Sequence, residues 1–446
     1  MPSIFEQMVL IPKIVSLGFA LTYQRLMQIF TAKIHRLTYS PVDRPKNVVV
    51  VGGSFGGFYL AKGLAESLPT GWRVVLIEKK SHFHFTWNFP RISVVSGHDH
   101  KCFIPFPRQL STAPQGVYLF KQGNVVAIDP LKVTLEDKTT FEYEYLAIAT
   151  GSQARYPAKL DADVKSDCIR FFQEQRRQIE AAKDIVVVGG GAAGVEVAGD
   201  IKTRHPDKHV TLVHSRDHIL NNFGEALHEI TKKALEEMGV SLYLGERVVS
   251  GLDSEAPEQV TLGSGKALRC DRLIKCTGQS AQSDLVKQFS PSSVAPSGGL
   301  IVEKTLQLKN SPSPQIFALG DVLDISGPKQ GRAASLQGFH VADNIVRSIK
   351  QTPLKDYKPT MIDVSIDLTL GLASRACLNH HRRSYTDKLY VPQQGKGVAF
   401  IDDFGRRHLS IKQTTTEELQ VARGWEAMGM KPFHDPEEMA ANELDA

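Results

Sequence analysis

The chain has 446 residues, 42% hydrophobic and 23% charged, which is typical of a globular protein of two or three domains. The net charge of +5 is small for this length, and no run of Lys and Arg alternates with aromatic residues, so nucleic acid is excluded as the expected partner. A C-x-x-C pair is absent from the five scattered cysteines, which indicates a reducing compartment and excludes electron transfer through a cysteine pair: Cys102, Cys168, Cys270, Cys276 and Cys377.

Residues 1–44 form an N-terminal segment with helical periodicity. After an apolar run from Met8 to Ala20, apolar residues recur at steps of three or four: Phe19, Tyr23, Leu26, Phe30, Ile34 and Leu37. The opposite face carries basic residues: Arg25, Lys33 and Arg36. Three interpretations compete, namely a cleaved mitochondrial presequence, a helix lying in the membrane interface, and a helix packing on the protein's own core. An interfacial or targeting role is favoured because a basic, acid-poor face suits anionic lipid, while the apolar part is too short and interrupted for a membrane span.

Residues 45–157 are predicted to be the first part of a dinucleotide-binding domain. The stretch NVVVVGGSFGGFYLAKG (47–63) is typical of a buried strand, a glycine turn and a helix of small residues. In such a turn the glycines allow a tight bend, close approach to a pyrophosphate and close packing of helix on strand. Ser54 stands where the second glycine is expected, which weakens the motif without excluding binding. The next strand, RVVLIEKK, ends on Glu78, a carboxylate expected to accept hydrogen bonds from an adenosine ribose.

The histidine-rich stretches do not predict a metal site. HFHF (82–85), HDH (98–100) and HH (380–381) lack the spacing of known His or Cys/His metal motifs. The run HFHFTWNFPR follows the Glu78 strand directly, so its aromatic residues are expected near the cofactor, with Arg91 reaching a carbonyl or the pyrophosphate.

Residues 158–283 are predicted to be a second dinucleotide-binding domain, because the first pattern recurs. Gly52 and Gly57 reappear 137 residues later as Gly189 and Gly194, within DIVVVGGGAAGVEVAGD (184–200). The strand YEYLAIATGS (143–152), which closes on a Thr-Gly pair, is echoed by CDRLIKCTGQ (270–279). An old duplication in which one copy no longer binds is the alternative, but both copies keep the turn chemistry that phosphate binding needs.

The two units differ where nucleotide specificity is set. The constant offset of 137 places Ser215 where the first unit has Glu78, and Arg216 follows it. A carboxylate repels a 2′-phosphate, whereas a hydroxyl beside a guanidinium can receive one. The first unit therefore suits the adenosine of FAD, and the second admits NADPH as well as NADH. An ordinary solvated charge is an equally weighted interpretation of Arg216.

Glu196 is the predicted catalytic residue. It lies one turn inside the second helix, on a face expected to look toward the nicotinamide, and Asp200 follows at i+4. The alternative is that these are acids of the first helical turns, which suit the helix dipole.

Residues 284–350 are predicted to complete the FAD-binding domain. A strand in this region ends on Leu319-Gly320-Asp321, and Asp321 is expected to hold the flavin ribityl chain unless it is an ordinary turn aspartate. A helix over 328–350 would aim its N-terminus at the flavin. Short β-like runs predict a C-terminal domain over 351–434, and residues 435–446 are expected to be a mobile acidic tail.

The predicted fold class is α/β, with two Rossmann-like dinucleotide-binding domains, the second inserted in the first. A smaller C-terminal α+β domain and an N-terminal amphipathic helix complete it. Two nucleotide sites without a metal motif or a cysteine pair favour hydride transfer from a nicotinamide to a flavin.

The segment DIVVVGGGAAGVEVAGDIKTRHPDKHVTLVHSR (184–216) resembles the NAD(P)H-binding unit of the apoptosis-inducing-factor-like, mitochondrion-associated family, which includes ferroptosis suppressors. That family is similar in turn to type II NADH:quinone reductases. NVVVVGGSFGG, YLAIATGS, IFALGDV and NIVRSIKQTPLKDYKP match it in order, so the resemblance covers about 46–360.

The resemblance implies an intracellular, FAD-dependent NAD(P)H:quinone oxidoreductase at a mitochondrial membrane or another lipid surface, the cytosolic face included. Pro2 replaces the glycine that N-myristoylation requires, so residues 1–40 are expected to supply the membrane contact. The alternatives are a flavin oxidoreductase acting on a soluble metabolite and a signalling flavoprotein that senses NAD(P)H. The complete predicted cofactor-binding set, in addition to Glu196, is Gly52, Gly53, Ser54, Gly56, Gly57, Glu78, Arg91, Val125, Thr150, Gly151, Gly320, Asp321 and Ala334 for FAD, and Gly189, Gly191, Gly194, Ser215, Arg216 and Gly278 for NAD(P)H.

Overall fold

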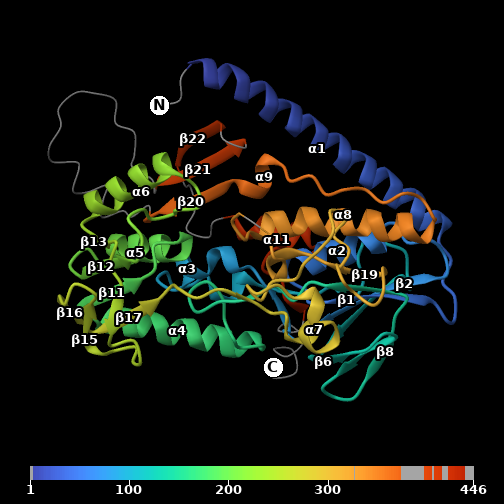
Figure 1. Cartoon of the computed structure of the whole chain (residues 1–446), viewed down its shortest axis with the longest axis horizontal. Helices are drawn as coiled ribbons and strands as arrows, with labels where there is room; N and C mark the ends of the chain where they lie inside the picture. Colours follow the sequence, from blue (N-terminus) through green and yellow to red (C-terminus); the bar gives the residue numbers. More distant parts are fainter. Residues whose placement is uncertain (1–3, 326, 373–395, 404–405, 414–419, 437–446) are drawn as a thin grey trace.

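Two parallel β-sheets, one for each glycine turn, organise the computed structural model, which describes residues 4–325, 327–372, 396–403, 406–413 and 420–436 (Figure 1). Both sheets carry helices, so the predicted α/β class is confirmed. Val48 to Val51 are almost completely buried because helices cover the sheet that contains them.

The first sheet has the strand order β19-β9-β1-β2-β5 and is parallel throughout. Its strand β19 comes from far downstream in the sequence and completes a sheet that the N-terminal half begins. The bounds are β1 (Lys46–Val51), β2 (Trp72–Glu78), β5 (Tyr118–Gln122), β9 (Tyr145–Ile148) and β19 (Ile316–Ala318).

The second sheet has the order β13-β12-β11-β17 and is also parallel. All four of its strands precede β19 in the sequence, so this sheet forms between two strands of the first. The bounds are β11 (Asp184–Val188), β12 (His209–His214), β13 (Ser241–Leu244) and β17 (Arg272–Lys275).

Smaller sheets surround these two. They are β3 (His82–His84) with β4 (Phe103–Pro105); β6 (Val125–Ile128), β7 (Lys132–Leu135) and β8 (Thr140–Glu142); β10 (Ser152–Gln153) with β18 (Ser280–Ala281); and β14 (Val248–Ser250), β15 (Glu258–Leu262) and β16 (Ala267–Cys270). The pairing of β10 with β18 joins the two segments that follow the Thr-Gly pairs.

Helices follow the glycine turns and pack on the sheets. α2 (Phe55–Ala65) leaves the first turn and packs along α8 (Gly331–Ile349), while α5 (Ala192–Arg204) leaves the second turn. The remaining helices of the two units are α3 (Phe89–Ile92), α4 (Lys165–Ala181), α6 (Glu225–Met238) and α7 (Asp284–Phe289).

The C-terminal part contributes the antiparallel sheet β20 (Ile366–Leu370), β21 (Lys396–Asp403) and β22 (Arg406–Gln413), with α9 (Met361–Val364) and α11 (Val421–Ala427). Trp425 of α11 is buried, and its Nε1–H donates to the carbonyl oxygen of Lys101 at 2.8 Å, so the chain returns to the first unit. One of the short β-like runs of the predicted C-terminal domain, KLYVP (388–392), lies outside the described residues.

The expectation of a mobile tail from Asp435 is wrong for that residue. Its side chain is buried between two partners, with Oδ2 lying 2.8 Å from Nε2 of His82 and 2.6 Å from Nζ of Lys165. A buried carboxylate with a cationic partner holds this part of the chain against the first unit.

The N-terminal segment is a single long helix, α1 (Ile4–Thr38), which runs along the edge of the molecule (Figure 1). Its C-terminal half packs on the first unit through Ala32 and His35, and the Nε2–H of His35 donates to the carbonyl oxygen of Leu68 at 2.6 Å. None of the described helices combines the length and the apolar character that crossing a membrane requires.

Candidate functional site

The two glycine turns have the same geometry. A Cβ atom on Gly57 would lie 1.7 Å from the carbonyl oxygen of Gly52, and one on Gly194 would lie 1.9 Å from that of Gly189. Gly52 and Gly189 themselves have positive φ angles of 99° and 118°. Only glycine satisfies both conditions, so the chain runs as close to the N-terminus of each helix as nucleotide-binding turns require.

The middle position of each turn faces open space. A Cβ atom on Gly191 would meet no atom within 4 Å, and Ser54, its counterpart, is exposed. Ser54 makes no side-chain hydrogen bond that caps α2, and Gly191 has no side chain with which to cap α5. The backbone N–H groups at the starts of α2 and α5 are therefore accessible to the pyrophosphate groups of two dinucleotides.

Glu78 lies at the end of β2 beside the first turn. Its carboxylate accepts hydrogen bonds from the backbone N–H of Gly53 at 2.5 Å and of Lys80 at 3.0 Å. Val125 begins β6 shortly after Gly123, whose N–H donates to the carbonyl oxygen of Glu78 at 2.9 Å. The structure thus places Glu78 and Val125, both predicted to bind FAD, in one region.

Asp321 lies where the two Thr-Gly segments meet. Its Oδ2 accepts hydrogen bonds from Ser152 at 3.0 Å and from Gln279 at 3.3 Å, and Nζ of Lys159 lies 3.6 Å away. Burial lowers the pKa of Lys159, while Asp321 opposes that effect. Thr150, Gly151 and Gly278 lie in the same two segments. Sequence reasoning missed Lys159 and Gln279, although Gln279 directly follows the second Thr-Gly pair.

The start of α8 faces this region. Ala334 lies beside both Gly56 and Gly320, since Cβ atoms on these glycines would come within 3.6 Å and 3.5 Å of its own Cβ. The N–H of Gly320 donates to Oε1 of Gln337 at 2.7 Å. Nε2 of Gln330, at the N-terminus of α8, is buried and has no hydrogen-bond partner among the described residues. A buried donor of this kind fits a ligand carbonyl oxygen, such as those of an isoalloxazine ring.

The strand register corrects one prediction in the second unit. β1 pairs Val51 with Ile77, and β11 pairs the equivalent Val188 with Val213. The residue after the pair is Glu78 in the first unit and His214 in the second, so Ser215 is not the counterpart of Glu78. The stretch from the start of the helix to the paired residue of the second strand runs from Phe55 to Ile77 in the first unit and from Ala192 to Val213 in the second. It is one residue shorter in the second unit, and the offset of 137 ends there.

Glu196 projects from α5 toward β20. Its Oε1 accepts hydrogen bonds from both the backbone N–H and the hydroxyl of Thr369, each at 3.0 Å. Burial raises the pKa of the Glu196 carboxyl to about 7, and nearby Asp200 adds to this rise, while Thr369 and Arg91 oppose it. A carboxyl whose pKa is raised toward neutrality is suited to holding or releasing a proton.

The structure places Arg91 elsewhere than predicted. Arg91 is 2% exposed, and its Nε donates to Oδ2 of Asp200 at 2.7 Å, so it pairs with α5. Asp200 therefore serves in this pair between the two units. The closeness of Arg91 to Glu78 in the sequence does not reveal the face of α3 from which the Arg91 side chain projects.

A family model described as pyridine nucleotide-disulphide oxidoreductase matches residues 46–338. This span contains both glycine turns, Asp321 and Ala334. It leaves out the whole of α1 and the sheet that carries Thr369.

Curated relatives cover most of the chain. Ferroptosis suppressor protein 1 of Taeniopygia guttata is 31% identical over 400 residues, 87% of this chain and 97% of that protein. Its human counterpart is 32% identical over 398 residues, 86% of this chain and 96% of that protein. Fe-regulated protein 8 of Mycosarcoma maydis is 33% identical over 359 residues, 75% and 89% of the two chains.

Solved structures share the fold. The sulfide:quinone oxidoreductase of Aquifex aeolicus has a TM-score of 0.65 at 18% identity, covering 89% of this chain and 94% of that one. The water-forming NADH oxidase of Lactobacillus brevis bound to NADH has a TM-score of 0.59 at 22% identity, covering 80% and 83%. At these identities the likeness concerns the fold alone.

Proposed function

Because the chain belongs to the pyridine nucleotide-disulphide oxidoreductase family, among the relatives of ferroptosis suppressor protein 1, we propose that it passes electrons from NAD(P)H to a quinone-type acceptor at a membrane surface. It is an FAD-dependent NAD(P)H oxidoreductase. FAD, held by the first glycine turn with Glu78 and Asp321, would supply the redox chemistry between the nicotinamide and the acceptor.

The observation that carries the proposal is the placement of Asp321 between the two Thr-Gly segments. Ser152 comes from the first unit and Gln279 from the second, and the side chains of both donate to the same Asp321 oxygen. The two nucleotide sites therefore open toward one region. The chain's own residues have to hold two cofactors in line and exclude water, and Glu196 can hold a proton beside them.

The cysteines favour a small-molecule acceptor over a protein disulfide. Burial raises the pKa of Cys168 and of Cys270 to about 11, and burial also raises the pKa of Cys102 and Cys276. Thiols held protonated in this way are poor nucleophiles. The four cysteines of the described residues are therefore unsuited to passing electrons on as a disulfide. This favours an acceptor such as a quinone, which takes up two electrons and two protons.

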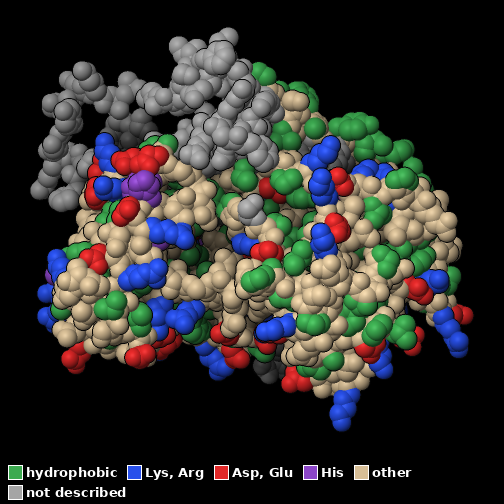
Figure 2. Space-filling view, in the orientation of Figure 1, with side chains coloured by type: hydrophobic (Ala, Val, Ile, Leu, Met, Phe, Trp, Pro, Cys, Tyr) green, Lys and Arg blue, Asp and Glu red, His purple; other side chains and the backbone are tan. Residues whose placement is uncertain are grey.

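The surface of α1 supports a location at a membrane. Several of its apolar side chains are exposed and form an arc on the side away from the body: Phe19, Tyr23, Leu26, Phe30, Ile34 and Leu37. Figure 2 shows apolar side chains gathered along this edge of the molecule. An exposed apolar face of this size on a helix flanked by basic residues is the pattern of an interfacial helix.

Besides its apolar arc, α1 has a face that packs on the rest of the protein. Nε2 of Gln28 donates to Oε2 of Glu66 at 2.8 Å, and the hydroxyl of Thr112 donates to Oε1 of Glu66 at 2.6 Å.

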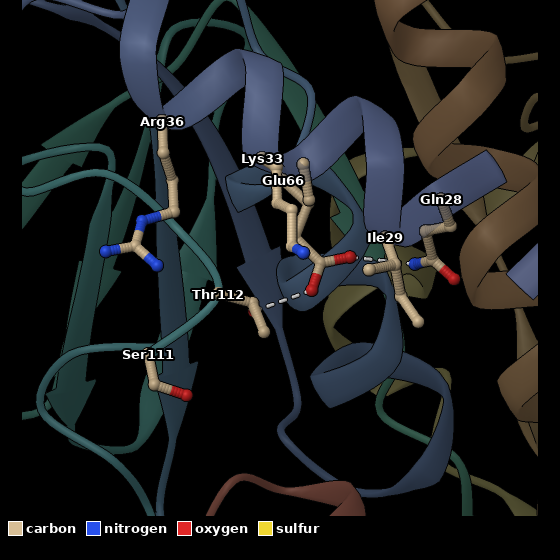
Figure 3. Close-up of a pocket in the computed structure, with 8 residues that line it drawn as sticks. Gln28, Ile29, Lys33, Arg36, Glu66, Ser111 and Thr112 are labelled. Atoms are coloured by element: carbon tan, nitrogen blue, oxygen red, sulfur yellow. Dashed lines mark hydrogen bonds between the residues drawn. The ribbon is translucent and has the colours of Figure 1, made fainter. Parts of the chain in front are cut away.

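Two cations of α1 lie beside this contact. Lys33 and Arg36 extend into the mouth of a pocket of about 120 Å³ (Figure 3). Both are exposed, and neither has an ion-pair partner among the described residues. These cations are placed to meet anionic headgroups while the apolar arc enters the lipid.

The experiment compares acceptors. The FAD-loaded protein is mixed with NADPH and either a short-chain soluble quinone or a long-chain quinone in vesicles containing anionic lipid. We expect turnover with both quinones, and faster turnover of the long-chain quinone in anionic vesicles than in zwitterionic ones. Turnover with a soluble non-quinone acceptor and none with either quinone would contradict the proposal.

A further inference from the structure

Two carboxylates and one guanidinium lie together where three parts of the chain meet. Glu196 and Asp200 are one turn apart on α5, and Arg91 contacts Asp200 from α3 of the first unit. Side chains at positions i and i+4 of a helix are neighbours, so the two acids lie close together. Thr369 approaches from β20 of the C-terminal sheet. This cluster contains one more acid than base.

The guanidinium belongs to Asp200. Nε of Arg91 lies 2.7 Å from Oδ2 of Asp200, and the two side chains are 2% and 0% exposed. Glu196 is held differently, because its Oε1 accepts hydrogen bonds from the backbone N–H and the hydroxyl of Thr369. The ion pair therefore compensates Asp200 and leaves the charge of Glu196 to be decided by its surroundings.

The two acids differ in their access to protons. Asp200 is completely buried, whereas Glu196 is partly exposed. Protonation of Asp200 would also leave the buried charge of Arg91 without its partner, which is costly. Glu196 is thus the member of the cluster that can take up and release a proton.

Opposing effects decide how firmly Glu196 keeps that proton. Burial and the charge of Asp200 favour the protonated acid, while the donors of Thr369 and the charge of Arg91 favour the carboxylate. The charge of Asp200 has a larger effect than the charge of Arg91. The charged groups acting on Glu196 are therefore Asp200 on its own helix and Arg91 on α3, and β20 contributes the neutral donors of Thr369.

We propose that the pair of Asp200 and Arg91 makes Glu196 a proton store, with Arg91 keeping Asp200 ionised and Asp200 keeping a proton on Glu196 at neutral pH. Asp200 and Arg91 are positioning residues in this arrangement, because they act through Glu196. The proposal deepens the proposed function, since it assigns the protonation state in which Glu196 takes part. The protonation of Glu196 does not depend on the identity of the electron acceptor.

The test removes one charge at a time from FAD-loaded protein. Asp200→Asn removes the anion and leaves Arg91 in place, and Asp200→Asn combined with Arg91→Met removes both charges. Arg91→Lys keeps the cation and is the control. Infrared absorption of the carboxylic acid C=O of Glu196, identified by its absence in Glu196→Gln, is followed against pH. Retained flavin absorption reports that the first unit is intact.

We expect the pH midpoint of Glu196 to fall by at least about one unit in Asp200→Asn, a ten-fold loss of proton affinity, because the cation then acts without its anion. The double variant should have a smaller fall, since it loses two opposing charges of which Asp200 has the larger effect. Arg91→Lys should keep the midpoint of the unchanged protein. An unchanged or higher midpoint in Asp200→Asn would overturn the proposal. If that variant does not fold, an unchanged midpoint in the double variant would overturn it.

Flavin reduction by NADPH separates this proposal from the catalytic role of Glu196. A lowered infrared midpoint in Asp200→Asn, together with an equal shift in the pH dependence of flavin reduction, would support both. A lowered infrared midpoint with flavin reduction that does not depend on pH would support the proton store and exclude Glu196 from the reaction.

Discussion

Thr369 donates two hydrogen bonds to one carboxylate oxygen of Glu196, from its backbone N–H and from its hydroxyl, each at 3.0 Å. Thr369 belongs to β20 of the C-terminal sheet, and Glu196 belongs to the helix that follows the second glycine turn. The C-terminal part of the chain therefore holds the side chain of Glu196 in one rotamer and lowers the pKa of its carboxyl. Donors to a carboxylate favour its ionised form.

Replacing Thr369 by Val should raise the pKa of Glu196 further, because the hydroxyl donor is lost and the backbone donor remains. A hydrogen bond to a charged group contributes about 1.5 to 3 kcal/mol, so the pKa should rise by about one to two units. The measurement is the pH dependence of flavin reduction by NADPH in anaerobic stopped flow. Thr369→Ser restores the hydroxyl, so the pH midpoint of its flavin-reduction rate should return to that of the unchanged protein. The same pH midpoint in all three proteins would show that Thr369 does not act through Glu196.

The raised pKa of Glu196 also predicts a pH-dependent cost in stability. The folded-state value of about 7 lies above the ordinary value of 4.5, so the folded protein binds the proton more tightly than the unfolded chain. The contribution of Glu196 to the free energy of unfolding is fully present below pH 4.5. About 3 kcal/mol of it is lost as the pH rises to 7. Glu196→Gln should remove this loss.

The free energy of unfolding of Glu196→Gln should therefore exceed that of the unchanged protein at pH 8, and the difference should shrink toward pH 5. Chemical denaturation followed by tryptophan fluorescence measures it. A difference that stays constant from pH 5 to 8 would mean that the carboxyl titrates normally.

Asp435 should anchor the last described part of the chain. Its carboxylate contacts Lys165 and His82, and both partners hold its pKa below the usual value. The resulting stabilisation is present at neutral pH and is lost as the pH falls through that lowered pKa. Asp435→Ala leaves the buried Lys165 ammonium without this partner, so it should lower the free energy of unfolding by about 2 to 4 kcal/mol at pH 7. Glu426→Gln, an exposed site on the neighbouring helix, is the control and should change it by less than about 0.5 kcal/mol. Equal effects of the two substitutions would rule out the anchoring role.

The apolar arc of α1 and its two exposed cations, Lys33 and Arg36, should have separable effects on membrane binding. Phe19 and Phe30 are 73% and 58% exposed, so replacing both by Ser should weaken binding to all vesicles without changing the stability of the fold. Lys33→Gln with Arg36→Gln should weaken binding to anionic vesicles by about ten- to thirty-fold at low salt, since each charge contributes about 1 kcal/mol. Binding to zwitterionic vesicles should stay the same. Vesicle sedimentation measures each case, and equal binding by all variants would show that α1 does not contact lipid.

The sequence predicted the elements whose causes are local. A valine run, a glycine turn and a small-residue helix specify a nucleotide-binding unit over a short stretch, and the repeat of that pattern identified the second unit. The constant offset failed at Ser215 because the second unit has one residue fewer between the start of its helix and the end of its second strand, which hydrophobic patterning does not reveal. The partners of Arg91 and Glu196 were not predictable, because Asp200 and Thr369 meet them from elements far away in the sequence.

Electrons are expected to pass from NAD(P)H through FAD to a quinone without the help of a protein thiol. The direct measurement is anaerobic double-mixing stopped flow on a variant with all five cysteines replaced by Ser. NADPH is added first, the visible flavin absorption is followed, and a short-chain quinone is then added. We expect NADPH to bleach the flavin and the quinone to restore its absorption, both at the rates of the unchanged protein. A flavin that is bleached by NADPH but stays reduced when the quinone is added would show that a quinone is not the acceptor.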